Sequence, residues 1–265
     1  MRYLWLEQPG AYLRFHDVPG NEPTVVYLPG LGGSASASFV ELVAQPALAA
    51  HRSLLIDPLG FGFSDRPVAF DYTLEDHART VAALLDHLGM SACAVFGHSW
   101  GGSVAIALAA LRPDLVACLV MAEANLEPGP QEGSNARFSS AIAGQTEQAF
   151  VGAGYQASLE WARREAPAWA GELLMADPTA LYRSAVSLVS ATPPTLLDRL
   201  ALLAIPRHYI FGALSLANAD MAHRAEELPR RSVHVLVVPG VGHDMGLNND
   251  PRSLAVVLRA ALGDS

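Results

Sequence analysis

A serine lies two residues from a glycine on either side, in the segment "GHSWG" at residues 97–101. An apolar run at 92–96 precedes this segment, and a run of small residues at 103–110 that favours a helix follows it. A serine on such a sharp strand-to-helix turn has a strained backbone, and only neighbours as small as glycine leave room for it. The first amides of the following helix would point at any group bound to Ser99. The pattern predicts that Ser99 is a nucleophile.

A serine hydroxyl is a weak nucleophile and needs a base that is itself held in place. Among the nine histidines, His243 follows the last apolar run, in the segment "PGVGHDM" at 239–245, where a loop leaves the predicted sheet. We therefore expect His243 to be the base; the alternative is a histidine of a surface loop. His98 is expected to pack under the turn, because adjacent side chains on such a turn point apart.

A third segment, "YLPGLGGSA" at 27–35, places a glycine-rich loop after another apolar run. Backbone N–H groups of such a loop can stabilise a developing oxyanion. We expect the N–H groups of Leu31 and Trp100 to be the two donors of this oxyanion hole. The alternative is a phosphate-binding loop, but the segment has neither the Gly-x-Gly-x-x-Gly spacing nor a Gly-Lys-Ser/Thr ending.

The elements that must position these residues follow from apolar runs that are nearly continuous, which is typical of parallel strands covered on both faces. These runs lie at 24–30, 53–60, 92–97, 116–125, 206–212 and 233–240. Residues 11–18 alternate instead, as in an antiparallel edge strand. Helices are predicted after Thr73, with Asp76 as capping partner and Gly89 at the end, and after Asp250, with Asp250 as the cap and Pro251 in the first turn. The repeated order of strand and helix predicts a doubly wound α/β sheet.

The interval from about 126 to 196 contains no strand pattern and three or four helical segments. We therefore expect a core domain of residues 1–125 and 197–265, with residues 126–196 inserted as a helical cap. The bulky aromatic residues of this interval are expected mostly to pack the cap on the core, with one or two lining a pocket. They are Phe138, Phe150, Tyr155, Trp161, Trp169 and Tyr182.

The composition excludes several classes of protein. The 265 residues are 51% hydrophobic with a net charge of -9, and the sequence has no basic cluster of the kind that binds nucleic acid. It has neither a signal-peptide pattern nor an apolar run long enough for a membrane span, so a cytoplasmic protein without membrane contact is expected. The two cysteines, Cys93 and Cys118, lie in strand-like runs and are expected to be core residues rather than a disulfide.

The four segments at 28–33, 57–67, 97–102 and 239–245 together resemble the α/β-hydrolase fold superfamily over nearly the whole chain. Segment 57–67, "DPLGFGFSDRP", is similar to the Asp-x-x-Gly-x-Gly-x-Ser-x-x-Pro loop of that family. The resemblance implies a mostly parallel sheet of eight strands, a helical cap between strands six and seven, and acyl-transfer chemistry at the loop edge of the sheet.

The acid of the expected catalytic triad departs from the family pattern. Members commonly carry an aspartate after strand seven, where this chain has Ser215. We expect Glu123, at the end of the sixth strand, to replace it, because a carboxylate at an apolar strand end needs a partner such as His243. Haloalkane dehalogenases of this fold place their acid there. The alternatives are Asp220 as the acid, and Glu123 as a solvated residue at the cap entrance.

These residues predict a serine hydrolase that cleaves a small carboxylic ester, or a similar carbonyl substrate, through an acyl-enzyme with the triad Ser99, Glu123 and His243. No cofactor is expected, and no His-Glu-x-x-His spacing indicates a metal site. The alternatives are a C–C bond hydrolase, thioesterase or lactonase of the same fold, or a ligand receptor using the same pocket. The acyl and alcohol groups, the pathway and the oligomeric state are left open.

Overall fold

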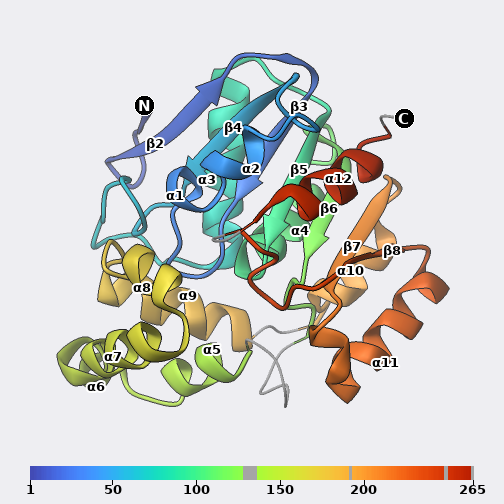
Figure 1. Cartoon of the computed structure of the whole chain (residues 1–265). Helices are drawn as coiled ribbons and strands as arrows, with labels where there is room; N and C mark the ends of the chain where they lie inside the picture. Colours follow the sequence, from blue (N-terminus) through green and yellow to red (C-terminus); the bar gives the residue numbers. More distant parts are fainter. Residues whose placement is uncertain (128–135, 191–192, 248–249, 264–265) are drawn as a thin grey trace.

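Eight strands form one sheet through the middle of the molecule (Figure 1). The computed structural model describes residues 1–127, 136–190, 193–247 and 250–263. Across the sheet the order is β1-β2-β4-β3-β5-β6-β7-β8. The strands are β1 (Arg2–Leu6), β2 (Ala11–Val18), β3 (Asn21–Leu28), β4 (His51–Asp57), β5 (Cys93–His98), β6 (Val116–Ala122), β7 (Arg207–Gly212) and β8 (His234–Val238). From β4 to β8 all neighbours are parallel, while β2 pairs antiparallel with β1 and β4, so the predicted mostly parallel sheet is confirmed.

Two sets of helices cover the two faces of this sheet. One hydrophobic cluster joins Val26 and Leu28 of β3 to α3, α4 and α10, and the other joins Val25 and Tyr27 of the same strand to α1, α2 and α12. These helices are α1 (Ala35–Ser38), α2 (Val40–Val43), α3 (Leu74–His87), α4 (Trp100–Leu111), α10 (Leu196–Leu202) and α12 (Arg252–Ala261). Burial of both faces explains why the central strands are apolar at nearly every position.

The edges of the sheet depart from that pattern. Strand β1 lies at one edge, with most of its residues exposed, and no apolar run predicted it. Its pairing with β2 holds it in place, from Arg2 opposite Phe15 to Leu6 opposite Ala11. Strand β8 at the other edge is only partly buried. The sequence patterns thus predicted seven of the strands, and the number eight came from the family resemblance alone because β1 gave no pattern.

Helices α3 and α12 begin close to the predicted residues, but their capping hydrogen bonds differ from the predicted ones. Thr73 caps α3 by accepting a hydrogen bond from the Asp76 N–H (3.1 Å), and Gly89 follows the helix with a φ of +64°. The Asp76 carboxylate, however, accepts the Thr73 hydroxyl (2.6 Å) rather than a backbone N–H. Helix α12 begins only at Arg252, whose N–H donates to the Asp250 carboxylate. No helix in the described ranges is both long and apolar enough to cross a bilayer.

A third group of helices lies within the interval 126–196, at the lower left of Figure 1. Its members are α5 (Ala136–Ala143), α6 (Glu147–Ala149), η1 (Phe150–Gly154), α7 (Tyr155–Glu165), α8 (Pro167–Leu173) and α9 (Pro178–Val189). The described residues of this interval contain no strand; segments 128–135 and 191–192 lie outside the described residues. The remaining helices, η2 (Ser215–Ala217), α11 (Ala219–Glu227) and η3 (Leu228–Arg231), stand between β7 and β8. The division into core and cap domains stays a prediction.

Both cysteines are free thiols, as the strand pattern predicted. Cys93 is buried on β5 and Cys118 is partly buried on β6. Burial raises the pKa of each thiol to about 11, so both are protonated and poorly nucleophilic at neutral pH.

The turn between β5 and α4 is possible only because its glycines have no side chain. A Cβ added at Gly97 would lie 2.5 Å from the carbonyl oxygen of Gly101. A Cβ added at Gly101 would lie 2.3 Å from the carbonyl oxygen of Leu28, at the end of β3. The backbones of β3, β5 and α4 therefore meet in direct contact beneath Ser99.

We expect Gly101→Ala to lower the free energy of unfolding by about 2 kcal/mol, because rigid backbone would have to move to admit one methyl group. Gly171→Ala is the matched control: Gly171 is exposed within α8 and has no atom within 4 Å of its added Cβ. It should be neutral or stabilise by up to about 1 kcal/mol through helix propensity. Urea unfolding measures both, and equal stabilities of the two variants would contradict the close packing.

Candidate active site

Ser99 stands between β5, which ends at His98, and α4, which begins at Trp100. Its backbone has φ of 52° and ψ of -123°, a conformation that a residue with a side chain seldom adopts. The residue is buried, and its N–H donates to the carbonyl oxygen of Ala122 (2.8 Å), at the end of β6. The strained turn predicted from the glycine pattern is thus present, and it puts the hydroxyl at the carboxyl edge of the sheet.

Glu123 and His243 meet at the same edge. The Nδ1 nitrogen of His243 lies 3.0 Å from Oε2 of Glu123. The other carboxylate oxygen, Oε1, accepts the N–H of Gly212, at the end of β7 (2.9 Å). A Cβ on Gly212 would lie 2.4 Å from the carbonyl oxygen of Gly242, so only glycine lets the loop of His243 come this close to β7.

The Glu123 side chain is 1% exposed, yet it is a stronger acid than an ordinary glutamate. Burial by itself would raise its pKa, but the hydrogen bond and the charge of His243 outweigh that effect and lower it. Hydrogen bonds from the Ser215 hydroxyl and the Gly212 N–H act in the same direction. The carboxylate is therefore ionised at neutral pH and able to hold a proton on Nδ1 of His243.

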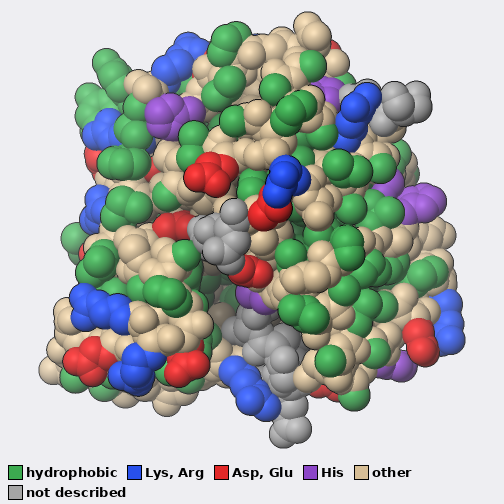
Figure 2. Space-filling view, in the orientation of Figure 1, with side chains coloured by type: hydrophobic (Ala, Val, Ile, Leu, Met, Phe, Trp, Pro, Cys, Tyr) green, Lys and Arg blue, Asp and Glu red, His purple; other side chains and the backbone are tan. Residues whose placement is uncertain are grey.

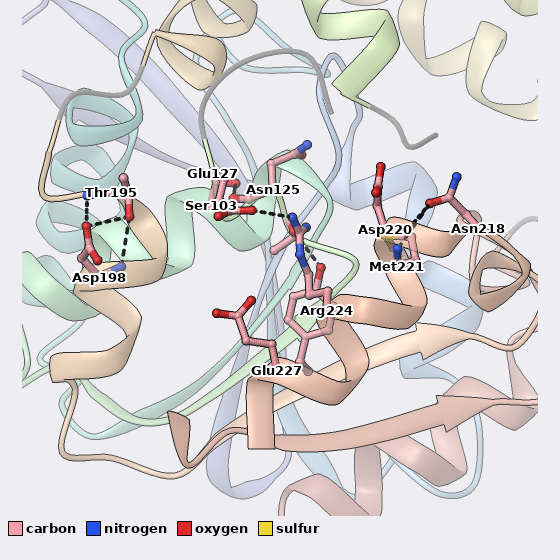
Figure 3. A network of polar contacts seen from close by, with 12 residues as sticks. Ser103, Asn125, Glu127, Thr195, Asp198, Asn218, Asp220, Met221, Arg224 and Glu227 are labelled. Carbon is pink, nitrogen blue, oxygen red and sulfur yellow. Dashed lines mark hydrogen bonds and ion pairs between the residues drawn. The ribbon is translucent and has the colours of Figure 1, made fainter. Parts of the chain in front are cut away.

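The segment that carries Glu123 is itself held firmly. Glu123 has a φ of 45°, in the left-handed region, at the point where β6 ends. Beyond it, the carbonyl oxygen of Asn125 accepts the Ser103 hydroxyl of α4 (2.8 Å), and Arg224 of α11 reaches the Glu127 carboxylate (3.2 Å). Figure 3 shows Arg224 pointing from α11 toward this segment. These anchors hold the chain that directly follows the strained residue.

The two histidines of the site carry their protons on different nitrogens. Nε2 of His98 lies 2.7 Å from the carbonyl oxygen of His243, and only a protonated nitrogen can donate to a carbonyl. Burial, with the neighbouring His243, lowers the pKa of His98 to about 3, so its ring is neutral. His243, in contrast, must carry its proton on Nδ1 to donate to Glu123, so its Nε2 is the nitrogen without a proton.

His98 thus supports the loop of the candidate base and does not compete with it for the serine proton. Its ring centroid lies 4.7 Å from that of His243. The expectation that His98 packs under the turn omitted this hydrogen bond.

The rival acids lie elsewhere. Asp220 is exposed on the first turn of α11, where its own N–H is bound by the Asn218 side chain (3.0 Å), as Figure 3 shows. Asp244 is exposed beside His243 and accepts the Gly246 N–H (3.4 Å). Ser215, in the usual place of the acid, hydrogen-bonds to Glu123.

Ser99 and His243 both line a cavity of about 310 Å³ beneath the helices of the interval 126–196. The cavity is lined by Gly30, Leu31, Gly33, Ser38, His98, Ser99, Trp100, Phe138, Ser139, Trp161, Ala166, Trp169, Glu172, His243, Asp244 and Leu247. Figure 2 shows acidic side chains and a histidine gathered near the middle of this face, beside the block formed by those helices. A volume of this size suits a small organic substrate.

The two residues predicted to form the oxyanion hole face the same cavity. Trp100 is the first residue of α4, so its N–H has no acceptor within the helix. Leu31 lies in the loop after β3, and its carbonyl oxygen accepts the indole N–H of Trp169, on α8 (3.1 Å). One peptide group of that loop is therefore fixed by a helix 138 positions further along the chain.

Two buried carboxylates hold the rest of the loop. Asp57, at the end of β4, accepts the Ser34 hydroxyl (3.0 Å) and the Ser36 N–H (3.1 Å). Glu172, on α8, accepts the Ser34 N–H (2.8 Å) and the Ser38 hydroxyl (2.6 Å). The motif at 57–67 and helix α8 thus both hold the glycine-rich loop through hydrogen bonds to its backbone and side chains.

The sequence did not predict that three of these residues take part in the candidate site: Ser215, Trp169 and Glu172. Ser215 was noted only as the absence of an aspartate, and its hydroxyl gave no separate signal. Trp169 was one of several aromatic residues with the same expectation. Glu172 did carry a signal, because it is a single carboxylate in the apolar segment "WAGELLMA" at 169–176.

Comparison with known proteins gives the family and the fold. The family described as alpha/beta hydrolase fold matches residues 23–207. Haloalkane dehalogenase 2 of Mycobacterium tuberculosis is 40% identical over 70 residues, which are 26% of this chain and 24% of the dehalogenase. A 2-hydroxy-6-oxononadienedioate/2-hydroxy-6-oxononatrienedioate hydrolase of Paraburkholderia phymatum is 35% identical over 124 residues, 45% of this chain and 43% of that protein. The matches thus span less than half the length of these relatives.

Solved structures match over almost the full length. An esterase from Exiguobacterium antarcticum superposes with a TM-score of 0.80, covering 98% of both chains at 18% identity. A thermophilic esterase from Thermogutta terrifontis has a TM-score of 0.77 at 22% identity and covers 99% of this chain and 98% of its own. At this level of identity the likeness shows the fold.

The pKa of Glu123 gives a prediction for stability. Because its folded pKa lies below the ordinary value of 4.5, the ionised carboxylate stabilises the protein above that pH, and this contribution is lost as the pH falls through the folded pKa. Glu123→Gln should therefore be less stable than the parent at pH 7, and the difference should narrow as the pH falls below about 4.5. Thermal melting of both proteins between pH 7 and pH 3 measures it; a gap that stays constant or widens would contradict the assignment.

Proposed function

The chain belongs to the alpha/beta hydrolase fold family, and we propose that it is an enzyme that hydrolyses carboxylic esters through an acyl-enzyme formed on Ser99. The observation that carries this proposal is the contact between His243 and Glu123 (3.0 Å) at the edge of the cavity that Ser99 also lines. A strained serine, a histidine in the required tautomer and a buried carboxylate are the three components of a serine triad.

In this proposal Ser99 attacks the ester carbonyl while Nε2 of His243 takes the hydroxyl proton. The alkoxide leaves with that proton, and His243 then activates a water molecule that releases the acid from Ser99. The Glu123 carboxylate holds the Nδ1–H tautomer and stabilises the imidazolium formed in each step. Its lowered pKa supports this role, because the group must remain ionised at the pH of turnover.

The negative oxygen of the tetrahedral intermediate would accept the N–H groups of Leu31 and Trp100. Trp100 supplies its N–H from the first turn of α4, where the amides of a helix carry partial positive charge. The bonds from Leu31 to Trp169 and from Ser34 to Glu172 support a loop that is already oriented before substrate arrives.

We also propose that residues 126–196 act as a cap on a core of residues 1–125 and 197–265. The cap helices contribute Phe138, Trp161, Trp169 and Glu172 to the cavity. This composition supports a division of labour in which the core supplies the reacting groups and the cap supplies bulky aromatic contacts to the substrate.

The names of the relatives suggest other reactions, which the chemistry of the site favours less. A dehalogenase forms its ester on a carboxylate nucleophile, and this chain has a serine at that position. Dienoate substrates of a C–C hydrolase carry carboxylates, whereas this cavity is lined by Glu172 and Asp244. The described Arg137 lines the adjoining pocket, which shares Phe138 and His243 with this cavity. Thioesters and lactones present the same carbonyl chemistry as esters, and a panel of such substrates would rank them.

A fluorophosphonate reagent should attach to Ser99 in equimolar amount and abolish ester turnover. Peptide mapping by mass spectrometry locates the label, and Ser99→Ala should lose both label and turnover while melting near the parent temperature. Absence of label and turnover in the parent would favour a ligand receptor. Label on Ser38 or Ser139, which line the same cavity, would overturn the assignment of the nucleophile.

The acid is tested by removing its charge while keeping its shape. Glu123→Gln should lower kcat by on the order of a thousandfold or more with little change in KM, because the wrong imidazole tautomer then faces Ser99. The scale follows from serine proteases, where the same change at the triad aspartate lowers kcat by roughly ten-thousandfold. Asp220→Asn, an exposed neighbour, should change kcat by less than about tenfold. The opposite result would make Asp220 the acid.

A further inference from the structure

The cavity contains a carboxylate that the proposed mechanism uses only to hold the loop after β3. Glu172 lies on α8 and is buried, with 7% of its surface exposed, and it lines the cavity together with Ser99 and His243. Carboxylates so deeply buried are rare unless other groups satisfy them. The partners of its two oxygens therefore indicate what the residue does.

Only one of those oxygens is satisfied by the protein. Oε2 accepts both the Ser34 N–H (2.8 Å) and the Ser38 hydroxyl (2.6 Å), which fastens α8 to the loop after β3. Within the described part of the chain Oε1 has no hydrogen-bond partner, and it is not among the polar atoms sealed in the interior. A tether between α8 and the loop accounts for Oε2 and leaves Oε1 available to a molecule in the cavity.

The surroundings of Glu172 favour a cation. No lysine or arginine is found among the described residues that line the cavity, and its second carboxylate, Asp244, lies exposed at the rim. Three aromatic rings of the cap line the same space: Phe138 contacts both Trp161 (5.5 Å between ring centroids) and Trp169 (4.7 Å). Aromatic faces attract cations, and a carboxylate with one free oxygen binds a charged donor more strongly than a neutral one.

We propose that Glu172 is a substrate-binding residue for a protonated amine, so that the preferred esters carry an ammonium group within the length of this cavity from the scissile carbonyl. The proposal rests on the ester hydrolysis proposed above and names its substrate class. Binding places the ammonium N–H groups on Oε1 and against the aromatic rings, and it neutralises a charge that would otherwise oppose the growing oxyanion.

The kinetic test compares two substrates of nearly equal shape, the p-nitrophenyl esters of 6-aminohexanoate and heptanoate. The parent enzyme should hydrolyse the amino ester with at least a roughly tenfold higher kcat/KM, the size expected of one hydrogen bond between charged groups. Glu172→Gln should remove that preference, mainly through the KM of the amino ester, whereas any disturbance of the loop after β3 should lower the kcat/KM of both esters by the same factor. Asp244→Asn is the matched control at the rim and should keep the preference.

A binding measurement separates this inference from the proposed reaction. In a Ser99→Ala background, calorimetric titration with hexylammonium chloride should show binding that 1-hexanol and hexanoate do not match and that Glu172→Gln abolishes. Binding without ester turnover in the parent would sustain the amine site and refute the esterase. Turnover with no preference for the amino ester, or an equal loss of both substrates in Glu172→Gln, would overturn the amine site alone. The substrate preference of the parent decides the question even if Glu172→Gln does not fold.

Discussion

The carboxyl edge of the sheet depends on one buried charge. An unpaired carboxylate in the interior costs several kcal/mol, so Glu123 requires its full set of partners. Those partners come from three separate elements: Gly212 at the end of β7, Ser215 in η2 and His243 after β8. The side chain therefore joins the ends of three neighbouring strands, and the packing of β7 against the His243 loop is a condition of its being charged at all.

The sequence predicted the site better than its supports, for a physical reason. Ser99, Glu123 and His243 each follow an apolar strand, and parallel strands bring their carboxyl ends to one edge, so local patterns sufficed to gather them. Strand β1 was missed because an exposed edge strand need not be apolar. Helix α12 begins at Arg252, one residue later than the sequence predicted. The Asp250 carboxylate accepts the Arg252 N–H, and no local pattern distinguishes this arrangement from a helix that begins at Pro251.

Contacts between α8 and the loop after β3 could not be predicted from local sequence patterns. The bonds from Trp169 to Leu31 and from Glu172 to Ser34 each join residues 138 positions apart. Whether a side chain of α8 meets this loop depends on how α8 packs over the sheet, and the hydrophobic periodicity of a helix does not predict that packing. Ser215 illustrates the same limit at short range, because its hydroxyl acts on the pKa of Glu123, a residue at the end of a neighbouring strand.

The hydrogen bond from the Trp169 indole to the Leu31 carbonyl also bears on how this enzyme could diversify. If the cap were an independent module on a constant core, exchanging it for another cap would be enough to change the substrate specificity. Here α8, within the proposed cap, also orients a peptide group of a loop that lines the same cavity as Ser99. A cap taken from another protein would have to place an N–H donor beside the Leu31 carbonyl, so the cap and the loop after β3 could not be exchanged independently.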